Sequence, residues 1–272
     1  EYTDETKYRA TPYTTGTTDS LVFNVSHTDS WVSNATFRQA VACSIDRDVL
    51  CEIATDGMYQ VVDSIFAPGN GAYDPDWVYP YSYNPDKAKE LLAECGYDGA
   101  PVTFVYCSAY PIPTAWATTI ENYMRQVGIN VTMEGTDLAG VIDRFSRRDY
   151  DMACMEYCAS YPDPLSSVYA MFRSDGYYNS WCYSTEKLDA QVMSLYGIAD
   201  PDEQAKAMQD LDHWAQTEAL YIPCYQVGGY TIYPATLQSS MVPEPMFGWA
   251  RVGYSFWVTQ SELADLLAEQ GK

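Results

Sequence analysis

A repeated alternation of strand and helix in the middle of the chain constrains the fold more than any other feature. Period-two and amphipathic helical patterns follow one another without long interruptions. The order is strand, helix, strand, helix, strand, over residues 102–107, 114–127, 129–133, 138–146 and 151–157. A helical crossover of this length joins parallel strands in the right-handed sense. The pattern therefore predicts an α/β fold with a parallel or mixed sheet flanked by helices.

Capping signals predict further helices on both sides of this alternation. Asn84-Pro85 provides an N-cap and a first residue, and Gly96 lies just past the end of that helix. Asp200-Pro201-x-Glu203 is a capping box that opens a helix to about Glu218. Pro223 places a strand over 221–226 at an edge or an end of the sheet. We also expect a strand over 20–25, helices over 35–44, 47–55, 165–172, 184–196 and 261–269, and a long loop over 58–83.

Charge and composition exclude several classes of protein. The chain has 272 residues, with 37 acidic against 15 basic side chains and a net charge of −22. This balance argues against nucleic acid and anionic membrane surfaces as partners, since both select for basic patches. No apolar run approaches the ~20 residues that span a bilayer. The chain begins at Glu1 without a signal segment, so we expect a processed protein or a part of a longer one.

Cysteine and histidine usage gives no reason to expect a metal or another cofactor. The eight cysteines contain no CxxC pair, and His27 and His213 are far apart in sequence. An exported protein could form disulfides, although eight cysteines allow 105 pairings. We expect at least four of them to be small buried residues, and His213 to be structural.

The stretch Tyr150–Pro164 is the candidate ligand site. A buried strand ends at about Tyr157, because Pro162 and Pro164 each remove a donor N–H and favour extended or turn geometry. Ligands of open α/β sheets bind outside the carboxyl ends of the strands. The loop after Tyr157 is therefore either one wall of a ligand site or an ordinary turn.

Two alternatives from other functional classes remain open. Glu156 and Asp163 flank this loop and could act as the carboxylate pair of an extracellular carbohydrate-active enzyme such as a glycosidase. The 25 tyrosines, with Trp and Phe beside them, would also suit a surface interaction module.

The order of several short motifs resembles one family. The segments are 37–57 (FRQAVACSIDRDVLCEIATDG), 83–97 (YNPDKAKELLAECGY), 157–164 (YCASYPDP), Asn179, Leu188-Asp189 and Ala219–Tyr225. Over about residues 20–240 they resemble the family 5 extracellular solute-binding proteins, the oligopeptide, dipeptide and nickel-binding group of bacterial ABC importers. The resemblance implies a periplasmic-binding-protein-like (type II) lobe. It also implies a non-enzymatic substrate-binding component that delivers a small solute, most often an oligopeptide, to an ABC permease in the membrane.

The resemblance covers only the C-terminal part of such proteins. It implies that 1–30 is a crossing segment from a missing N-terminal lobe, 31–228 the ligand-binding lobe, and 229–272 return strands with a C-terminal helix. It also implies an extracellular, lipid-anchored or periplasmic location.

The expected ligand-binding residues are Tyr157, Ser160, Tyr161 and Asp163, with help from the 58–83 loop. Peptide-binding relatives bind the ligand's amine with an acidic residue where this chain has Ser160. Since serine cannot provide that charge-assisted bond, either Asp163 meets the amine or the ligand has no free amine.

Overall fold

The computed structural model describes residues 7–158, 163–235, 238–239, 256–257 and 268. The chain divides into two compact units, one of residues 16–227 and one that combines residues 1–15 with 228–272. Residues 17–23 pair with a strand inside the larger unit. The expected helix over 261–269 lies outside the described residues except at position 268.

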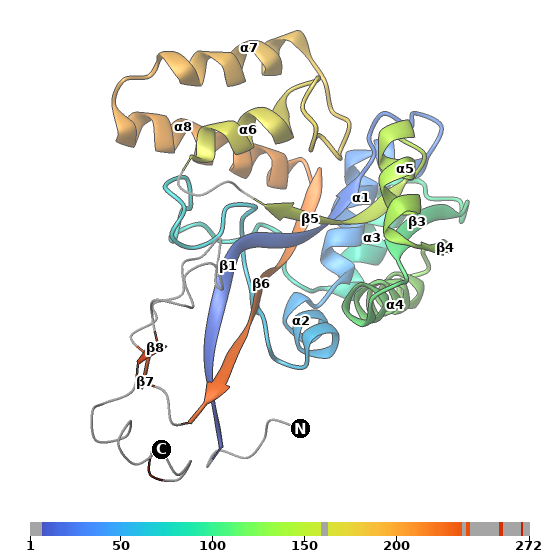
Figure 1. Ribbon diagram of the computed structural model, residues 1–272. Helices are drawn as coiled ribbons and strands as arrows, with labels where there is room; N and C mark the ends of the chain where they lie inside the picture. Colours follow the sequence, from blue (N-terminus) through green and yellow to red (C-terminus); the bar gives the residue numbers. More distant parts are fainter. Residues whose placement is uncertain (1–6, 159–162, 236–237, 240–255, 258–267, 269–272) are drawn as a thin grey trace. The chain divides into compact units, whose positions relative to one another are not determined.

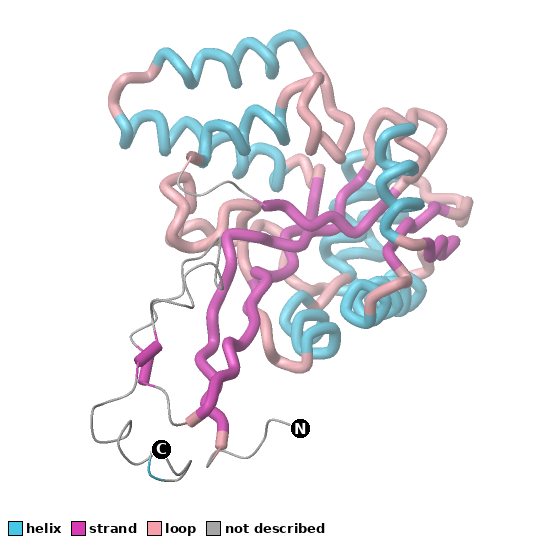
Figure 2. Tube along the Cα trace, viewed as in Figure 1, coloured by secondary structure: helices cyan, strands magenta, loops and turns pink. Residues whose placement is uncertain are grey.

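A mixed sheet forms the centre of the larger unit (Figure 1). Its described strands are β1 (Tyr8–Phe23), β2 (Gln60–Val61), β3 (Val102–Cys107), β4 (Val131–Thr136), β5 (Met152–Cys158) and β6 (Tyr221–Pro234). They stand in the order β2-β6-β1-β5-β3-β4, so β1 and β6 run side by side, as Figure 2 shows. β3 pairs in parallel with both β4 and β5, and β1 pairs antiparallel with β5. The predicted parallel crossovers are confirmed. In the smaller unit, β7 (Gln238–Ser239) pairs with β8 (Phe256–Trp257).

The helices begin and end largely where their capping residues predict. The bounds are α1 (Ala35–Ser44), α2 (Arg47–Thr55), α3 (Pro85–Cys95), α4 (Pro111–Gln126), α5 (Leu138–Arg147), α6 (Pro164–Phe172), α7 (Glu186–Ser194) and α8 (Pro201–Thr217), with short 3-10 turns at Trp31–Ser33 and Leu195–Gly197. Asn84 Oδ1 accepts from Lys87 N at 3.0 Å, and Gly96 ends α3 with a φ of 76°. The Asp200 side chain accepts from two N–H groups at the start of α8.

Helices cover both faces of the sheet because successive strand residues point to opposite sides. Phe104 and Met152 pack into a core with Trp116 of α4, whereas Val105 and Ala153 pack into a second core. That second core contains residues of α6, α7 and α8, which Figure 1 shows together on one side. The carboxyl ends of the parallel strands lie beyond these two cores, and the candidate cleft opens at these ends.

Several predictions were wrong in detail: β1 spans Tyr8–Phe23 rather than 20–25, β4 spans Val131–Thr136 rather than 129–133, and β6 continues past 226 to Pro234. α4 begins at Pro111 rather than at Thr114, because Pro111 occupies the first turn, where no N–H is needed. α7 is capped by Thr185 rather than Ser184. β6 is flanked by β2 and β1 and is therefore not an edge strand. Pro223 is accommodated because β2 is only two residues long and pairs with Tyr225 and Gln226.

Arg38 joins distant parts of the larger unit. Its guanidinium is buried and donates to the Glu218 and Ala219 carbonyls at 2.7 and 2.9 Å, just after α8. It also donates to Val32 and Ser33 at 2.9 and 3.0 Å, just before α1. One side chain therefore satisfies carbonyls from segments about 180 residues apart.

Candidate functional site

The carboxyl ends of the parallel strands border a cleft. β3 ends at Cys107 and β4 at Thr136, and the following loops lead into the N-termini of α4 and α5. A hollow of about 970 Å³ within the larger unit opens at this edge and extends along α5 to Arg148 and Tyr150, which precede β5. Ligands of α/β sheets bind at such an edge, and small-molecule sites measure roughly 300–1,000 Å³. Both position and size suit a solute.

Large apolar and aromatic side chains form most of the cleft. Four of them are substantially exposed: Tyr110 (54%), Leu138 (51%), Ile142 (52%) and Tyr177 (80%). Tyr59, Ile112, Phe145, Met155 and Tyr178 also line the cleft. Exposed apolar residues gathered at one concave site mark a contact surface, since scattered ones would need no explanation.

Among the described cleft residues, Asp19 and Arg148 carry charge. Asp19 lies on β1, where the buried Tyr225 hydroxyl hydrogen-bonds to its carboxylate. Arg148 follows α5 in the left-handed region, with a φ of 55°. Its amide donates to the Phe145 carbonyl at 3.1 Å, and its own carbonyl accepts from Asn24 Nδ2 at 2.8 Å. Both charges are thus attached to fixed backbone.

Three thiols line the cleft, at Cys107, Cys154 and Cys182. Burial raises the pKa of the Cys154 and Cys182 thiols, so both remain protonated near neutral pH. Within the described residues, no group of three or more His, Cys, Asp or Glu could hold a metal ion. Seven cysteines, all except Cys158, whose side chain lies outside the described part, are free thiols. Cys43, Cys51, Cys182 and Cys224 are buried, which confirms the expectation of at least four small buried cysteines.

The sequence-predicted site residues are only partly placed by the structure. Tyr157 lies in β5, but its side chain, like that of Glu156, falls outside the described part of the protein. Ser160 and Tyr161 also lie outside the described residues. Asp163 is exposed and caps α6, its Oδ1 accepting from Leu165 N at 3.1 Å, and it is not among the described residues of the cleft.

The 58–83 loop is mainly structural. Tyr59 reaches the cleft, but Ile65 and Phe66 lie in the core, and Trp77 stacks on His213 with 3.7 Å between ring centroids. His213 Nε2 also lies 3.5 Å from Asp74 Oδ2, which confirms the structural role expected for this histidine.

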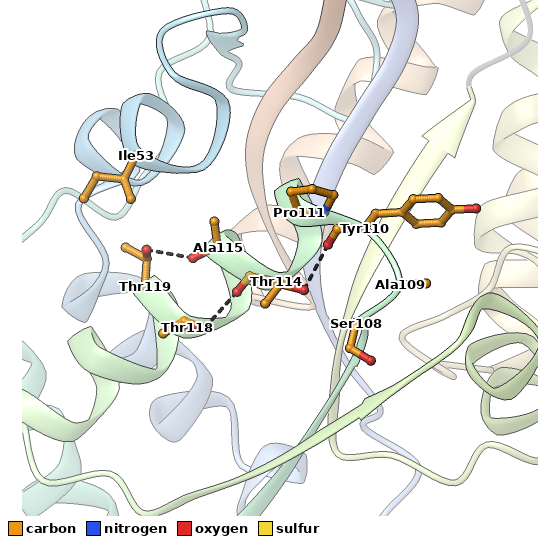
Figure 3. A pocket seen from close by; sticks show the side chains of 9 residues that line it. All are labelled: Ile53, Ser108, Ala109, Tyr110, Pro111, Thr114, Ala115, Thr118 and Thr119. Atoms are coloured by element: carbon orange, nitrogen blue, oxygen red, sulfur yellow. Dashed lines mark hydrogen bonds between the residues drawn. The ribbon is translucent and has the colours of Figure 1, made fainter.

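A second, shallower hollow of about 560 Å³ lies between α2 and α4 (Figure 3). Its threonine hydroxyls bond back to carbonyls of their own helix: Thr114 to Tyr110 at 2.9 Å and Thr118 to Thr114 at 2.8 Å. No charged residue is among the described residues that line it. This hollow therefore offers little to orient a ligand, and the larger cleft is the better candidate site.

Sequence reasoning missed most residues of the cleft. They come from loops and helix starts far apart in sequence, such as Asp19, Tyr110, Arg148 and Tyr177. The carboxyl-edge rule could have identified Tyr110, because it follows the well-predicted strand that ends at Cys107. Asp19 and Tyr177 had no such signal, since only the tertiary structure brings them to this edge.

The family model for bacterial extracellular solute-binding proteins, family 5 (middle region), matches residues 1–179. The chain belongs to this family. The periplasmic oligopeptide-binding protein OppA of Salmonella typhimurium is 25% identical over 215 residues, covering 71% of this chain and 39% of OppA.

Solved structures of solute-binding proteins share the fold. The substrate-binding protein CtaP of Listeria monocytogenes superposes with a TM-score of 0.85 at 19% identity, over 93% of this chain and 52% of CtaP. AppA of Bacillus subtilis, solved in complex with a nonapeptide, gives a TM-score of 0.78 at 18% identity, over 93% of this chain and 53% of AppA. The chain thus spans about two fifths of OppA and about half of each of these two structures. The predicted family and the periplasmic-binding-protein-like fold are confirmed.

None of the helices in the described part of the chain is long and apolar enough to cross a lipid bilayer.

Proposed function

We propose that this chain forms one wall of the solute-binding cleft of an ABC import system. The observation that carries this proposal is the apolar cleft of about 970 Å³ at the carboxyl edge of β3 and β5, in a member of family 5. A second lobe of the full-length protein supplies the opposite wall. This chain matches about half of the length of each of the two solved relatives, which supports the division into two lobes.

An oligopeptide is the ligand class that the relatives favour. OppA is named as an oligopeptide-binding protein, and AppA was solved with a nonapeptide. The two lobes close on the solute, and the closed form is the state that docks to a membrane permease. The protein acts outside the cytoplasmic membrane, in the periplasm or anchored to the cell surface by a lipid, and carries out no chemical reaction on its ligand.

A thermal-shift screen of the full-length protein tests this function. A ligand that binds only the native state raises the melting temperature by mass action. We expect a rise with di- to pentapeptides and none with oligosaccharides or nickel chelates. Tyr110→Ala should reduce the rise, whereas Tyr196→Ala, an equally exposed tyrosine outside the cleft, should leave it unchanged. A rise with sugars alone, or equal rises for both variants, would contradict the proposal.

Affinity should also depend on both walls. A ligand bound at ~1 μM represents ~8 kcal/mol, and this free energy is divided between the two lobes. The 272-residue chain alone should therefore bind a peptide orders of magnitude more weakly than the full-length protein. Equal affinities by calorimetry would show that one wall suffices.

The absence of catalysis needs its own test. Glu156→Gln removes one member of the carboxylate pair that a glycosidase would need. We expect neither the wild type nor this variant to hydrolyse oligosaccharides. Hydrolysis that is lost in Glu156→Gln would establish an enzyme instead.

A further inference from the structure

We propose that the α5 limb, the part of the hollow between α5 and residues 176–182, binds a linear alkyl carboxylate such as a fatty acid. The carboxylate lies at Arg148 and the alkyl chain lies along the apolar stripe of α5. This ligand belongs to a different chemical class from the peptide proposed for the carboxyl edge. The inference therefore goes beyond the proposed function and does not depend on it.

The helix provides the first wall of the α5 limb as one continuous stripe. Leu138, Val141, Ile142, Phe145 and Arg148 stand at positions i, i+3, i+4, i+7 and i+10, and all five line the hollow. Helices of globular proteins bury such a stripe in the core. Here Val141 is buried, whereas Leu138 and Ile142 remain 51% and 52% exposed. The described residues thus leave much of this apolar face uncovered.

The floor and the opposite wall of the α5 limb are also apolar. Cys107 and Met155 come from the sheet and Tyr178 from the opposite wall, and all three line the hollow and pack against the second core. The Tyr150 hydroxyl donates to the Ser180 carbonyl, which joins the floor to this wall. The limb is therefore a groove on one face of the sheet, with apolar side chains on three sides.

Arg148 places a positive charge at the far end of the groove. Its amide donates to the Phe145 carbonyl at 3.1 Å and its carbonyl accepts from Asn24 Nδ2 at 2.8 Å, so its backbone is fixed. Burial raises the pKa of the Cys182 thiol, whereas the Tyr150 hydroxyl and the charge of Arg148 oppose this rise. The guanidinium therefore lies near the wall opposite α5.

No carboxylate of the described residues lies within ion-pair distance of Arg148. Asp149, the next residue in the chain, lies 2.9 Å from Arg144 instead. Asp19, the acidic residue of the cleft, is the strand partner of Glu156, near the other end of β5. Guanidinium groups bind carboxylates with two parallel hydrogen bonds, so the carboxylate of a ligand suits this position.

The length of the groove and its lack of free donors favour an alkyl chain. Leu138 and Arg148 lie roughly 15 Å apart along α5, since a helix rises about 1.5 Å per residue. An extended chain advances about 1.2 Å per bond, so roughly 12 carbons would span this length. The Asn179 amide nitrogen donates to the Arg173 and Tyr183 carbonyls at 2.8 and 2.9 Å, which leaves it no hydrogen for a peptide backbone. An alkyl chain needs no such partner.

A chain-length series tests the apolar part of the site. The full-length protein is titrated by calorimetry with octanoate, decanoate, dodecanoate and tetradecanoate, each below its micelle concentration. We expect one ligand per protein and an affinity that rises by up to about fourfold per added methylene as far as dodecanoate, with little gain beyond it. Ile142→Asn should reduce this gain, whereas Ile53→Asn, at a similarly exposed position of α2 outside the larger cleft, should keep it.

A change of head group tests Arg148. The wild type should bind dodecanoate at least about tenfold more tightly than dodecanol, because only the carboxylate forms charge-assisted hydrogen bonds. Arg148→Gln should bind both compounds equally, and Arg148→Lys should keep the preference. Arg147→Gln removes an exposed charge of α5 that does not line the cleft, so it should also keep the preference. Thermal melts of each variant monitor folding.

Detergent-like adsorption would overturn the inference. Its signs are many dodecanoate molecules per protein, or equal affinities of the wild type for dodecanoate and dodecanol. The tripeptide Leu-Phe-Leu, titrated in parallel, separates the inference from the proposed function. Binding of the peptide but not of dodecanoate would overturn the inference alone, and binding of dodecanoate but not of the peptide would overturn the proposed function alone. Binding of neither would overturn both.

Discussion

Replacing Arg38 by methionine should destabilise the fold by about 3 kcal/mol. Methionine keeps most of the aliphatic stem but removes every donor, so four carbonyls lose their partner. Hydrogen bonds to a charged group contribute about 1.5 kcal/mol or more each, roughly 6 kcal/mol for the set. Burial of the charge offsets part of this stabilisation, since it lowers the pKa of Arg38 to about 10 from 12.5. Removing the charge therefore recovers about 3 kcal/mol of the free energy that burying the guanidinium costs.

Urea unfolding followed by tryptophan fluorescence measures the effect. We expect a lower midpoint with an unchanged slope, because the surface exposed on unfolding stays the same. Arg147→Met is the matched control, since its guanidinium is exposed and its surface ion pair contributes about 0–1 kcal/mol. Arg38→Lys should recover only part of the loss, because one ammonium cannot reach carbonyls on both segments. A loss below about 1 kcal/mol in Arg38→Met would show that the four bonds do not hold these segments together.

Two further predictions concern stability. Burial raises the pKa of the Asp212 carboxyl to about 6 from 3.8, so the folded state binds more protons than the unfolded state between these values. Stability relative to Asp212→Asn should therefore rise by about 2 kcal/mol as pH falls from 7 to 4, and a pH-independent difference in urea midpoints would contradict this. In Gly176→Ala the new Cβ would lie 2.3 Å from the Ala170 carbonyl oxygen, which should cost about 1–3 kcal/mol, whereas Gly197→Ala meets nothing within 4 Å and should be nearly neutral. Equal melting temperatures for the two glycine variants would contradict this.

Local sequence signals predicted most of the architecture because they act over a few residues. Asn84, Asp200 and Gly96 function as predicted at helix ends. The predicted range of β3 matches the observed strand, since its apolar pattern is bounded by a proline and a polar loop. The errors arose where tertiary pairing decides: β6 tolerates Pro223 only because its outer neighbour is a two-residue strand.

The site was harder to predict than the fold. The sequence placed the candidate site at the carboxyl edge of the sheet and assigned recognition to the loop after Tyr157, with Asp163 and the 58–83 loop, and this assignment stays a prediction. The cleft collects residues from β1, from the starts of α4 and α5, and from the loop around Tyr177. Their proximity follows from strand order, and pairing of β1 with β5 is a long-range contact that no local pattern encodes.

Hydrogen–deuterium exchange of the full-length protein, with and without a saturating tripeptide, would locate the ligand most directly. Binding at the carboxyl edge should protect the amides of three separate segments, 107–113, 138–148 and 176–182, because each lines the cleft. The outer surface of α2 and α4 around Ile53 and Thr118 should exchange at the same rate in both states. Protection confined to that outer surface, or no protection in any of the three segments, would place the ligand elsewhere and contradict the cleft described above.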